Sequence, residues 1–382
     1  MPMRKVLFVT TISGFLPQFE KNDVKLLGEM GCQVHYASNF RNPVYAFDEK
    51  ELKSQGIFLH HIDIAKSPVK IRENIAAIRQ LRTVIEENDI DIIHCHNPMG
   101  GVAGRAAGTG RRRPYVIYTA HGFHFYKGAP LLNWLLFYPA ERFLARFTNQ
   151  LVTINKEDYV RARGFLLRPG GNTVHIHGVG VNPERFCPDK GTGEKMRKRL
   201  GVPRDAFHIV TAAELNANKN QKVIIEAISR LGSKDIYYSI CGKGPNEKVL
   251  KALVREKHLE KQVRFLGYRT DMEDVLRSAD CFAFPSRREG LGVAAIEALL
   301  CGVPLIAADN RGTREYAING INSIVCRPDN VEDFQEAIWL LCKDAGTRIR
   351  MADACRASAG KFTINETGKT MKEVYQKALG SL

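Results

Sequence analysis

Residues 284–299 read FPSRREGLGVAAIEAL, and this stretch decides the fold of the chain. The apolar run at 281–284 that leads into it predicts a buried strand, and the apolar periodicity after it predicts a helix. In an open α/β sheet, ligands bind beyond the carboxyl ends of the strands. Unpaired N–H groups at the start of the following helix attract anions. The stretch therefore predicts a parallel α/β sheet with a small-molecule site at the end of this strand.

Two glycines and two glutamates supply the chemistry of this loop. Gly290 and Gly292 let the backbone approach a ligand, because no Cβ stands in the way. Glu289 and Glu297 are suited to accept hydrogen bonds from ligand hydroxyls, and the apolar helix around Glu297 favours a polar partner for its carboxylate. A simpler interpretation stays open, in which the glycines form a tight turn and Glu297 is a solvated helix residue.

The same alternation of short strands and helices runs along the whole chain. It implies right-handed βαβ units and parallel sheets. We expect strands at 5–10, 33–37, 57–62, 91–94, 115–119, 151–154, 209–212, 236–241, 263–266, 281–284, 304–307 and 323–325.

A segment rich in glycine and proline, 177–193, predicts a domain boundary. A length of 382 residues also favours two domains. We expect one Rossmann-like domain over residues 1–185 and another over residues 186–363, followed by a final helical segment, 364–382. Two doubly wound domains of this kind open their strand ends into a shared cleft.

Composition narrows the cellular setting. The nine cysteines form no C-x-x-C pair, which favours reduced thiols in a cytosol over disulfides or a zinc site. The chain enters a strand within its first residues, so we expect no signal peptide. The most apolar segment, 131–147, contains charged residues and falls short of the roughly 20 apolar residues that a membrane span needs. We therefore expect a cytoplasmic protein.

The net charge of +15 favours anionic partners but does not indicate which kind. The excess is shared by both halves, and its densest run, residues 111–113, precedes a strand in a glycine-rich loop. Two interpretations stay open: a solvated loop, or a contact with anionic lipid headgroups at the inner face of the cell membrane. No nucleic-acid-binding motif accompanies the charge, so we expect no nucleic-acid partner.

Other strand ends carry further candidate residues. Lys219 lies just before a helix, where it could neutralise a diphosphate or simply be a surface lysine. Gly242 belongs to a tight strand-to-helix turn that could touch a ligand. His96 and His121 follow neighbouring strands. They are not spaced with carboxylates or cysteines as a metal set would be, so we expect no metal and no cofactor.

Together these residues resemble glycosyltransferase family 4, the retaining, nucleotide-sugar-dependent enzymes of the GT-B fold. The resemblance covers essentially the full length and is closest to bacterial enzymes of capsule and exopolysaccharide biosynthesis. Its motifs are 263–268 (VRFLGY), Glu289-x7-Glu297, Gly302-Val303-Pro304 and, in the first half, 119–123 (TAHGF).

The resemblance implies a role for each candidate. Glu289 would contact hydroxyls of the donor sugar, Glu297 the ribose, and Lys219 the diphosphate, while His121 would meet sugar and acceptor. The remaining donor contacts would come from Gly14, Gly242, Gly267, Tyr268, Arg269, Gly290, Leu291, Gly292 and Val293. His96, Phe123 and His124 would lie on the acceptor side. The final helix would cross back onto the first domain.

The chain departs from the family at Glu214, where an arginine is usual. This removes one cationic phosphate contact, and either Lys219 with the helix terminus suffices, or Arg287 or Arg288 substitutes. The resemblance implies retention by same-face attack, with the departing phosphate taking the acceptor proton. Neither glutamate then acts as a nucleophile, unlike the carboxylates of retaining hydrolases.

The acceptor side is unusually aromatic at 123–126 and 131–138. Either the helix there faces the core, or it forms an interfacial patch that reaches a polyprenyl-diphosphate-linked glycan. The sequence thus predicts a hexosyltransferase whose donor is a nucleotide-sugar, and a UDP-sugar is the first candidate for that donor. Two alternatives stay open: a nucleotide-sugar epimerase or phosphorylase of the same fold, and a catalytically silent sugar-nucleotide-binding subunit.

Overall fold

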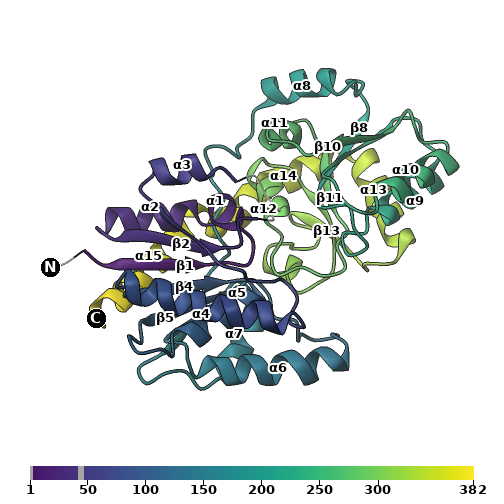
Figure 1. The fold of residues 1–382 in the computed structure, drawn as a ribbon. Helices are drawn as coiled ribbons and strands as arrows, with labels where there is room; N and C mark the ends of the chain where they lie inside the picture. The colour runs from purple at the N-terminus through teal and green to yellow at the C-terminus, as the bar shows by residue number, and fades with distance from the viewer. Residues whose placement is uncertain (1–2, 42–46) are drawn as a thin grey trace. The chain divides into compact units, whose positions relative to one another are not determined.

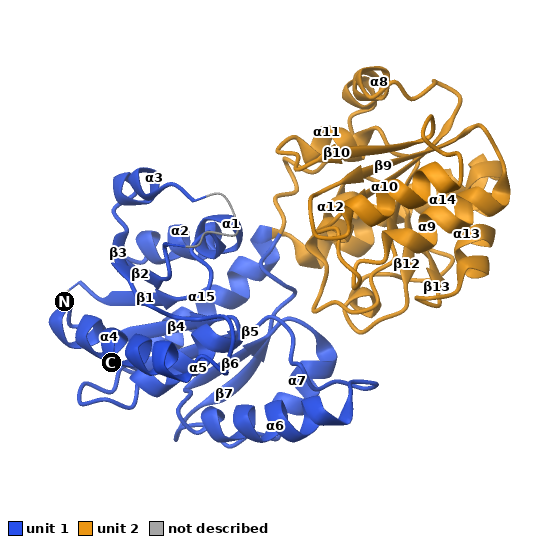
Figure 2. Cartoon of the chain, turned by 45° about the vertical axis from the view of Figure 1, so that its right-hand side comes forward, with its two compact units in different colours: residues 1–180, 364–382 blue, residues 181–363 orange. Residues whose placement is uncertain are grey.

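The computed structural model describes residues 3–41 and 47–382 of the chain. They form two compact units, residues 1–180 with 364–382 and residues 181–363 (Figure 2). The predicted boundary after residue 185 lies five residues beyond this division. Each unit is built around one parallel sheet with helices along the chain between its strands (Figure 1).

Unit 1 contains a seven-stranded sheet in the order β3-β2-β1-β4-β5-β6-β7. Its strands are β1 Lys5–Val9, β2 Gln33–Ser38, β3 Phe58–His61, β4 Ile92–His96, β5 Tyr115–Ala120, β6 Gln150–Thr153 and β7 Asn172–His175. Its helices are α1 Phe15–Phe19, α2 Lys21–Glu29, α3 Glu49–Ser54, α4 Ile71–Glu87, α5 Pro98–Ala107, α6 Leu131–Ala145, α7 Lys156–Ala162 and α15 Ile364–Gly380. The central strands β1, β4 and β5 are almost wholly buried, and β1 is accordingly apolar almost throughout, whereas β4 buries two histidines, His94 and His96.

Unit 2 contains a six-stranded sheet in the order β10-β9-β8-β11-β12-β13. Its strands are β8 Phe207–Ala212, β9 Ile236–Cys241, β10 Val263–Gly267, β11 Cys281–Phe284, β12 Leu305–Ala308 and β13 Ser323–Cys326. Its helices are α8 Lys190–Arg199, α9 Gln221–Leu231, α10 Glu247–Glu256, α11 Met272–Arg277, α12 Val293–Leu300, α13 Val331–Lys343 and α14 Ala345–Ala359, with short 3-10 turns at Thr313–Glu315 and Gly360–Phe362.

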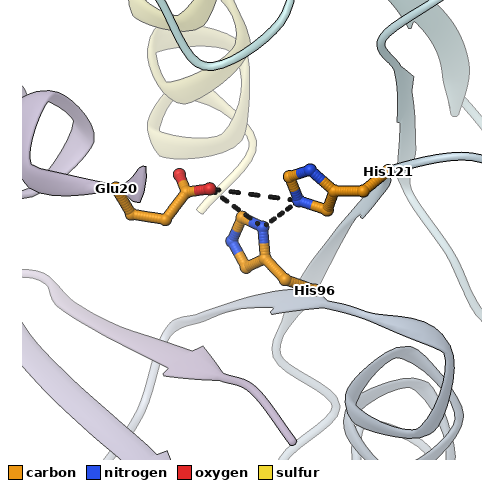
Figure 3. Close-up of side chains that lie close together, drawn as sticks. All are labelled: Glu20, His96 and His121. Atoms are coloured by element: carbon orange, nitrogen blue, oxygen red, sulfur yellow. Dashed lines mark hydrogen bonds and ion pairs between the residues drawn. The ribbon is translucent and has the colours of Figure 1, made fainter. Parts of the chain in front are cut away.

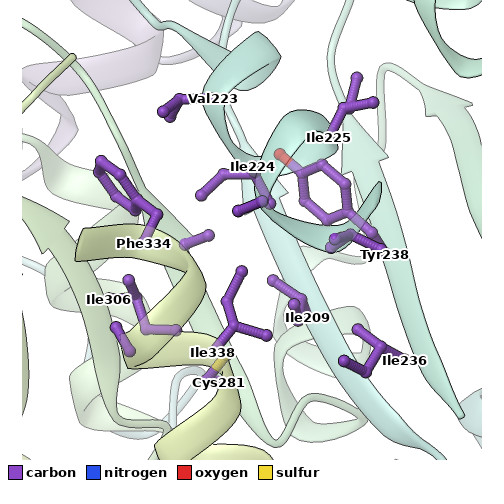
Figure 4. Packing of buried hydrophobic residues seen from close by; sticks show 14 of the residues in the cluster. Ile209, Val223, Ile224, Ile225, Ile236, Tyr238, Cys281, Ile306, Phe334 and Ile338 are labelled. Atoms are coloured by element: carbon purple, nitrogen blue, oxygen red, sulfur yellow. The ribbon is translucent and has the colours of Figure 1, made fainter. Parts of the chain in front are cut away.

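The core of unit 2 shows how a doubly wound sheet is stabilised. Ile209 and Ile306 of the sheet meet Ile224 of α9 and Phe334 and Ile338 of α13 (Figure 4). All five side chains are buried, and burying an aliphatic or phenyl side chain contributes roughly 1.5–3 kcal/mol. The apolar faces of α9 and α13 thereby hold the strands from which the site loops depart.

The predicted α/β fold with two doubly wound sheets is confirmed. Within residues 3–41 and 47–382, twelve of the thirteen strands lie where the sequence predicted them, with ends that differ by at most two residues. The strand that was not predicted is β7, an edge strand whose four residues are all half-buried. Its sequence, NTVH, contains no apolar run, so only the pairing with β6 reveals it.

Helix α6 divides its residues between two environments. Trp134, Phe137 and Tyr138 pack against the core of unit 1. Leu132 and Leu135, by contrast, are more than 60% exposed. One face of α6 therefore covers the core, as the first interpretation predicted, and another is open to solvent. Contact of the open face with a lipid-linked glycan stays a prediction. Across the described residues, the structure contains no helix that is both long enough and apolar enough to cross a membrane.

Candidate functional site

Each sheet has one place where the strand order reverses, and the candidate residues gather at these two places. In unit 1 the reversal lies between β1 and β4, and in unit 2 between β8 and β11. At such a switch point the loops after the two strands leave in opposite directions and open a crevice. The loops after β8 and β11 carry Lys219 and Glu289. In unit 1, His96 ends β4 at the switch point, and His121 follows β5, the next strand in the sheet.

In unit 2, Lys219 and Glu289 form an ion pair across the switch point. Lys219 Nζ lies 2.5 Å from Glu289 Oε1, and the two side chains are 22% and 11% exposed. The ammonium also lies 5.7 Å from the centre of the Phe284 ring. The structure thus brings together two residues that the sequence placed 70 positions apart, and it neutralises the predicted phosphate-binding lysine with the predicted sugar-binding glutamate.

A loop after β12 that the sequence did not single out braces Glu289. Asn310 Nδ2 donates to the Ser286 carbonyl at 2.9 Å, and Arg311 Nε donates to the Glu289 carbonyl at 3.3 Å. A Cβ added to Gly312 would lie 2.8 Å from the Glu289 Cβ. This close packing fixes the backbone that carries the carboxylate. Its only sequence signal is a polar, glycine-containing run directly after a strand.

Gly292 begins helix α12 in the left-handed region, with φ +97°. A Cβ there would lie 2.6 Å from the Phe284 ring and 2.7 Å from the Tyr316 hydroxyl, so local packing alone requires glycine. Leu291 is buried beside it. Val293 is the first residue of the helix, where backbone N–H groups have no partner within the helix. The loop therefore presents a helix N-terminus beside the ion pair.

Glu297 lies one turn into helix α12, away from this ion pair. Burial raises the pKa of Glu297 to about 7, with nearby Arg185 opposing the rise. Arg185 is itself held by Glu273 at 2.8 Å. Glu297 is half-buried, so the interpretation as a freely solvated helix residue is wrong.

Four other predicted donor contacts occupy neighbouring strand ends in unit 2. Gly267 ends β10, Tyr268 is 58% exposed, and Arg269 is paired with Asp271 at 2.6 Å. Gly242 follows β9 with φ +130°, and a Cβ there would lie 2.0 Å from the Ala213 carbonyl oxygen. Backbone packing thus explains this glycine without a ligand, and its donor contact stays a prediction.

The structure also shows the surroundings of Glu214, where the family usually has an arginine, and of Arg287. Glu214 is exposed and accepts a hydrogen bond from Asn216 at 2.9 Å. Arg287 pairs with Asp329 at 2.7 Å and donates to the Ala217 carbonyl. Arg287 is thus engaged by other groups on the unit 2 surface, and a contact of Arg288 with the phosphate stays a prediction.

In unit 1, a carboxylate joins the two predicted histidines (Figure 3). His96 Nδ1 lies 3.1 Å from His121 Nε2 and 3.4 Å from Glu20 Oε1, and His121 Nε2 lies 4.0 Å from the same oxygen. Burial lowers the pKa of His121 to about 4 and that of His96 well below its usual range. Burial and the neighbouring Asp23 raise the pKa of Glu20 well above its usual range. Glu20 was not among the predicted residues, because it follows the short α1 segment and lies far from either histidine in the chain.

Beneath these residues lies a buried polar chain that includes the C-terminal helix. The Tyr375 hydroxyl of α15 donates to Asp23 Oδ2 at 2.8 Å and lies 2.8 Å from His94 Nδ1. His94 Nε2 in turn lies 2.8 Å from the Thr119 hydroxyl. Burial lowers the pKa of His94 to about 3, so the imidazole is neutral. Residues from α2, β4, β5 and α15 are tied together in this way. The predicted return of the final helix to the first domain is therefore observed.

The other predicted acceptor-side residues, Phe123 and His124, make contacts within unit 1. Phe123 is buried in the core of unit 1, and its backbone N–H donates to Asp158 at 3.0 Å. The His124 ring lies 4.7 Å from that of Phe137. Gly14, which was predicted as a donor contact, caps α1, and the preceding Ser13 carbonyl accepts a hydrogen bond from Tyr36 at 2.6 Å. Ligand contacts of these residues stay predictions.

Family models match both units. The model described as glycosyl transferases group 1 matches residues 193–358, and the glycosyl transferase 4-like domain matches residues 22–177. EpsD of Bacillus subtilis (strain 168), whose name describes a glycosyltransferase, is 38% identical over 377 residues, covering 97% of this chain and 96% of its own.

Two further comparisons extend this similarity. The UDP-Gal:alpha-D-GlcNAc-diphosphoundecaprenol alpha-1,3-galactosyltransferase of Escherichia coli is 26% identical and covers 79% of this chain and 81% of its own. The crystal structure of Anabaena HepE in complex with UDP-glucose has a TM-score of 0.79 at 20% identity, covering 99% of this chain and 100% of that one. The predicted GT-B fold and the resemblance to glycosyltransferase family 4 are confirmed. This chain is a glycosyltransferase and belongs to the glycosyl transferases of group 1, with a glycosyl transferase 4-like domain in its first unit.

Proposed function

We propose that this glycosyltransferase moves a sugar from a UDP-sugar to a polyprenyl-diphosphate-linked glycan, with retention, in the biosynthesis of a bacterial capsule or exopolysaccharide. The observation that carries the donor half is the Lys219–Glu289 pair at the switch point of unit 2, beside the N-terminus of α12. A cation and a helix terminus at one crevice suit a diphosphate.

The substrates are supported by the relatives. The Escherichia coli enzyme is named for a UDP-galactose donor and an undecaprenol-diphosphate-linked acceptor, and HepE was solved with UDP-glucose. The first of these proteins is similar to this chain in sequence and the second in fold, and the donor or ligand of each is a UDP-sugar. We assign the same classes of donor and acceptor to this chain.

Donor binding would exchange one ion pair for two separate contacts. Without a ligand, Lys219 is neutralised by Glu289 at 2.5 Å. An arriving diphosphate carries more negative charge than one carboxylate and would take over the ammonium. Glu289, held by the loop after β12, would then be free to accept hydrogen bonds from sugar hydroxyls. Glu297, further along α12, would accept from the ribose.

The chemical step needs stabilisation of charge on the leaving group. As the bond to the sugar breaks, negative charge grows on the diphosphate, and Lys219 with the amides of Val293 and its neighbours would stabilise it. Because these groups supply the positive charge, we propose that transfer requires no metal. The departing phosphate would take the acceptor proton on the same face of the sugar, and His121 would orient sugar and acceptor.

Nucleotide release from a panel of UDP- and GDP-sugars, with and without an undecaprenyl-diphosphate-linked sugar, tests this proposal. We expect release from one UDP-sugar that depends on the acceptor, unchanged by EDTA, with the anomeric configuration of the donor kept in the product. Epimer formation without nucleotide release would instead identify an epimerase. Binding without turnover would identify a silent subunit.

We also propose that unit 1 rests on an anionic membrane surface at the cytoplasmic face. The exposed apolar side chains of α6 are Leu131, Leu132, Leu135, Leu136 and Phe143. Arg142 and Arg146 of the same segment are exposed beside them. Apolar side chains with neighbouring cations are the composition of an interfacial helix, and such a site would bring the enzyme to a lipid-linked acceptor.

Co-sedimentation with vesicles that contain an anionic phospholipid tests the membrane proposal. Leu135→Ser with Leu136→Ser should release most of the bound protein, whereas Leu166→Ser, at another exposed leucine of unit 1, should not. If wild-type protein stays in the supernatant even at low salt, the membrane proposal is wrong, while the transfer assay above is unaffected.

A further inference from the structure

The three facing atoms of Glu20, His96 and His121 have the spacing of ligands around a metal ion. The triangle formed by Glu20 Oε1, His96 Nδ1 and His121 Nε2 has sides of 3.1, 3.4 and 4.0 Å. A point equidistant from the three corners lies about 2.1 Å from each, which is the length of Zn–N and Zn–O bonds. An ion could thus contact all three atoms with little rearrangement.

The chemistry of the three groups agrees with this geometry. Two neutral imidazoles and one carboxylate form a donor set that divalent d-block ions such as Zn²⁺ bind, and three protein ligands leave a fourth position for water. Among the described residues, Glu20 Oε1 is buried without a hydrogen-bond partner. A buried carboxylate in this state is costly, and a divalent cation would compensate its charge.

An apolar side chain covers one side of the cluster, and solvent reaches the other. The Phe15 ring lies 5.6 Å from that of His96 and 5.0 Å from that of His121, so an apolar side chain covers the cluster. The side chains of Glu20 and His96 are buried, but that of His121 is 21% exposed. Solvent therefore reaches the cluster at His121, where the fourth position would lie.

We propose that Glu20, His96 and His121 bind one divalent d-block ion of the Zn²⁺ class, and that this ion inhibits the enzyme. The bound ion would hold the His121 ring, which we propose orients sugar and acceptor. The binding site stands on the geometry of unit 1 alone, whereas the inhibition rests on the proposed role of His121 in transfer. Metal-independent catalysis and an inhibitory metal site are compatible, because the ion would add nothing at the unit 2 phosphate site.

Isothermal titration calorimetry of the full chain with ZnCl₂, after treatment with a chelator and buffer exchange, tests the site. We expect one strong site per chain. Glu20→Gln removes the charge at nearly constant shape and should weaken zinc binding at least about tenfold, as should His121→Gln. Circular dichroism with thermal unfolding checks that both variants fold.

His60→Gln is the matched control. His60 Nε2 lies 2.9 Å from His35 Nδ1 in the same unit, but the third partner there is the amide of Gln33, without a carboxylate. We expect this variant to keep the strong site. If wild-type protein and Glu20→Gln bind zinc equally, or if the folded wild-type protein binds none at micromolar concentration, the proposal is wrong.

A transfer assay with increasing Zn²⁺ then separates binding from inhibition. We expect zinc to inhibit the wild-type enzyme at the concentrations at which calorimetry shows binding, and EDTA to reverse the effect. Zinc binding without inhibition would keep the site and overturn the inhibitory role. Failure of the transfer assay itself would overturn the proposed function and leave the calorimetric result standing.

Discussion

The switch points of the two units share a topology and differ in charge. Unit 2 places a lysine and a glutamate there as an ion pair that is partly open to solvent. Unit 1 places two imidazoles at the ends of β4 and β5 and a buried glutamate at the end of α1, and burial keeps both imidazoles neutral. The same strand order thus presents a cation–carboxylate pair in one unit and a carboxyl group with two neutral imidazoles in the other. Topology determines where a ligand can lie, and the side chains after the strands determine which ligand it is.

The two sites also differ in which parts of the chain fix their side chains in position. In unit 2 the support is local, because the loop after β12 hydrogen-bonds to the loop that carries Glu289. In unit 1 it comes from far along the chain, because Tyr375 of α15 bonds to Asp23 beneath the histidines. Substitutions at the ion pair should therefore change catalysis, and substitutions at the buried tyrosine should change stability. Three experiments test this difference.

Removing the cation of unit 2 should have the largest effect. Lys219→Ala should lower kcat/KM about a hundredfold, roughly 2.7 kcal/mol, because a charge-stabilising contact to the leaving group is lost. UDP should also bind more weakly in calorimetry. Lys222→Ala, at the exposed Lys222–Glu226 pair of α9, is the control and should behave as wild type. Wild-type kinetics for Lys219→Ala would mean that another cation binds the diphosphate.

Substitution of Tyr375, the buried tyrosine of unit 1, should have the second-largest effect. Tyr375→Phe leaves Asp23 and His94 without a hydrogen-bond partner that each now has, and should lower the free energy of unfolding by about 2 kcal/mol. Chemical denaturation measures this change. UDP affinity, which we assign to unit 2, should stay the same. Tyr237→Phe, at a half-buried position of β9, serves as the control and should cost much less. A loss of UDP affinity in folded Tyr375→Phe protein would contradict the independence of the two sites.

The smallest effect should come from the partner of the lysine. Glu289→Gln should lower kcat about tenfold, roughly 1.4 kcal/mol, through weaker contacts to the sugar hydroxyls. The same change frees Lys219, so UDP itself should bind no more weakly than to wild type, and this split distinguishes Glu289 from Lys219. Glu226→Gln is the matched control on α9. Equal losses in UDP affinity for Glu289→Gln and Lys219→Ala would show that the ion pair acts as one binding unit instead of being exchanged.

Local patterns were enough to predict most of the fold. Buried parallel strands have continuous apolar sequences, so β8 and β11 could be placed from the sequence alone. Strand β7 was missed because an edge strand with half-buried side chains has no such pattern. Lys219 and Glu289 were singled out because each follows a strand, but nothing local indicates that they pair with each other.

Long-range contacts account for what the sequence did not reveal. Glu20 meets His96 only because the chain between them folds β2, β3 and β4 into one sheet. Tyr375 reaches His94 across 281 positions. Gly242 was predicted to face a ligand, yet the Ala213 carbonyl already requires a residue without a side chain there. Residue type and position cannot distinguish such a packing requirement from a ligand contact.

The return of α15 to unit 1 has a consequence for recombination between relatives. Unit 1 is discontinuous in the chain, because residues 364–382 belong to it together with residues 1–180. A hybrid that imports a foreign donor half therefore needs two junctions, near residues 180 and 364, so that the recipient keeps its own C-terminal helix. A hybrid with a single junction would pair Asp23 and His94 with the helix of a different parent. Donor halves can be exchanged as inserts in this architecture, whereas simple end-to-end fusion mismatches a buried contact.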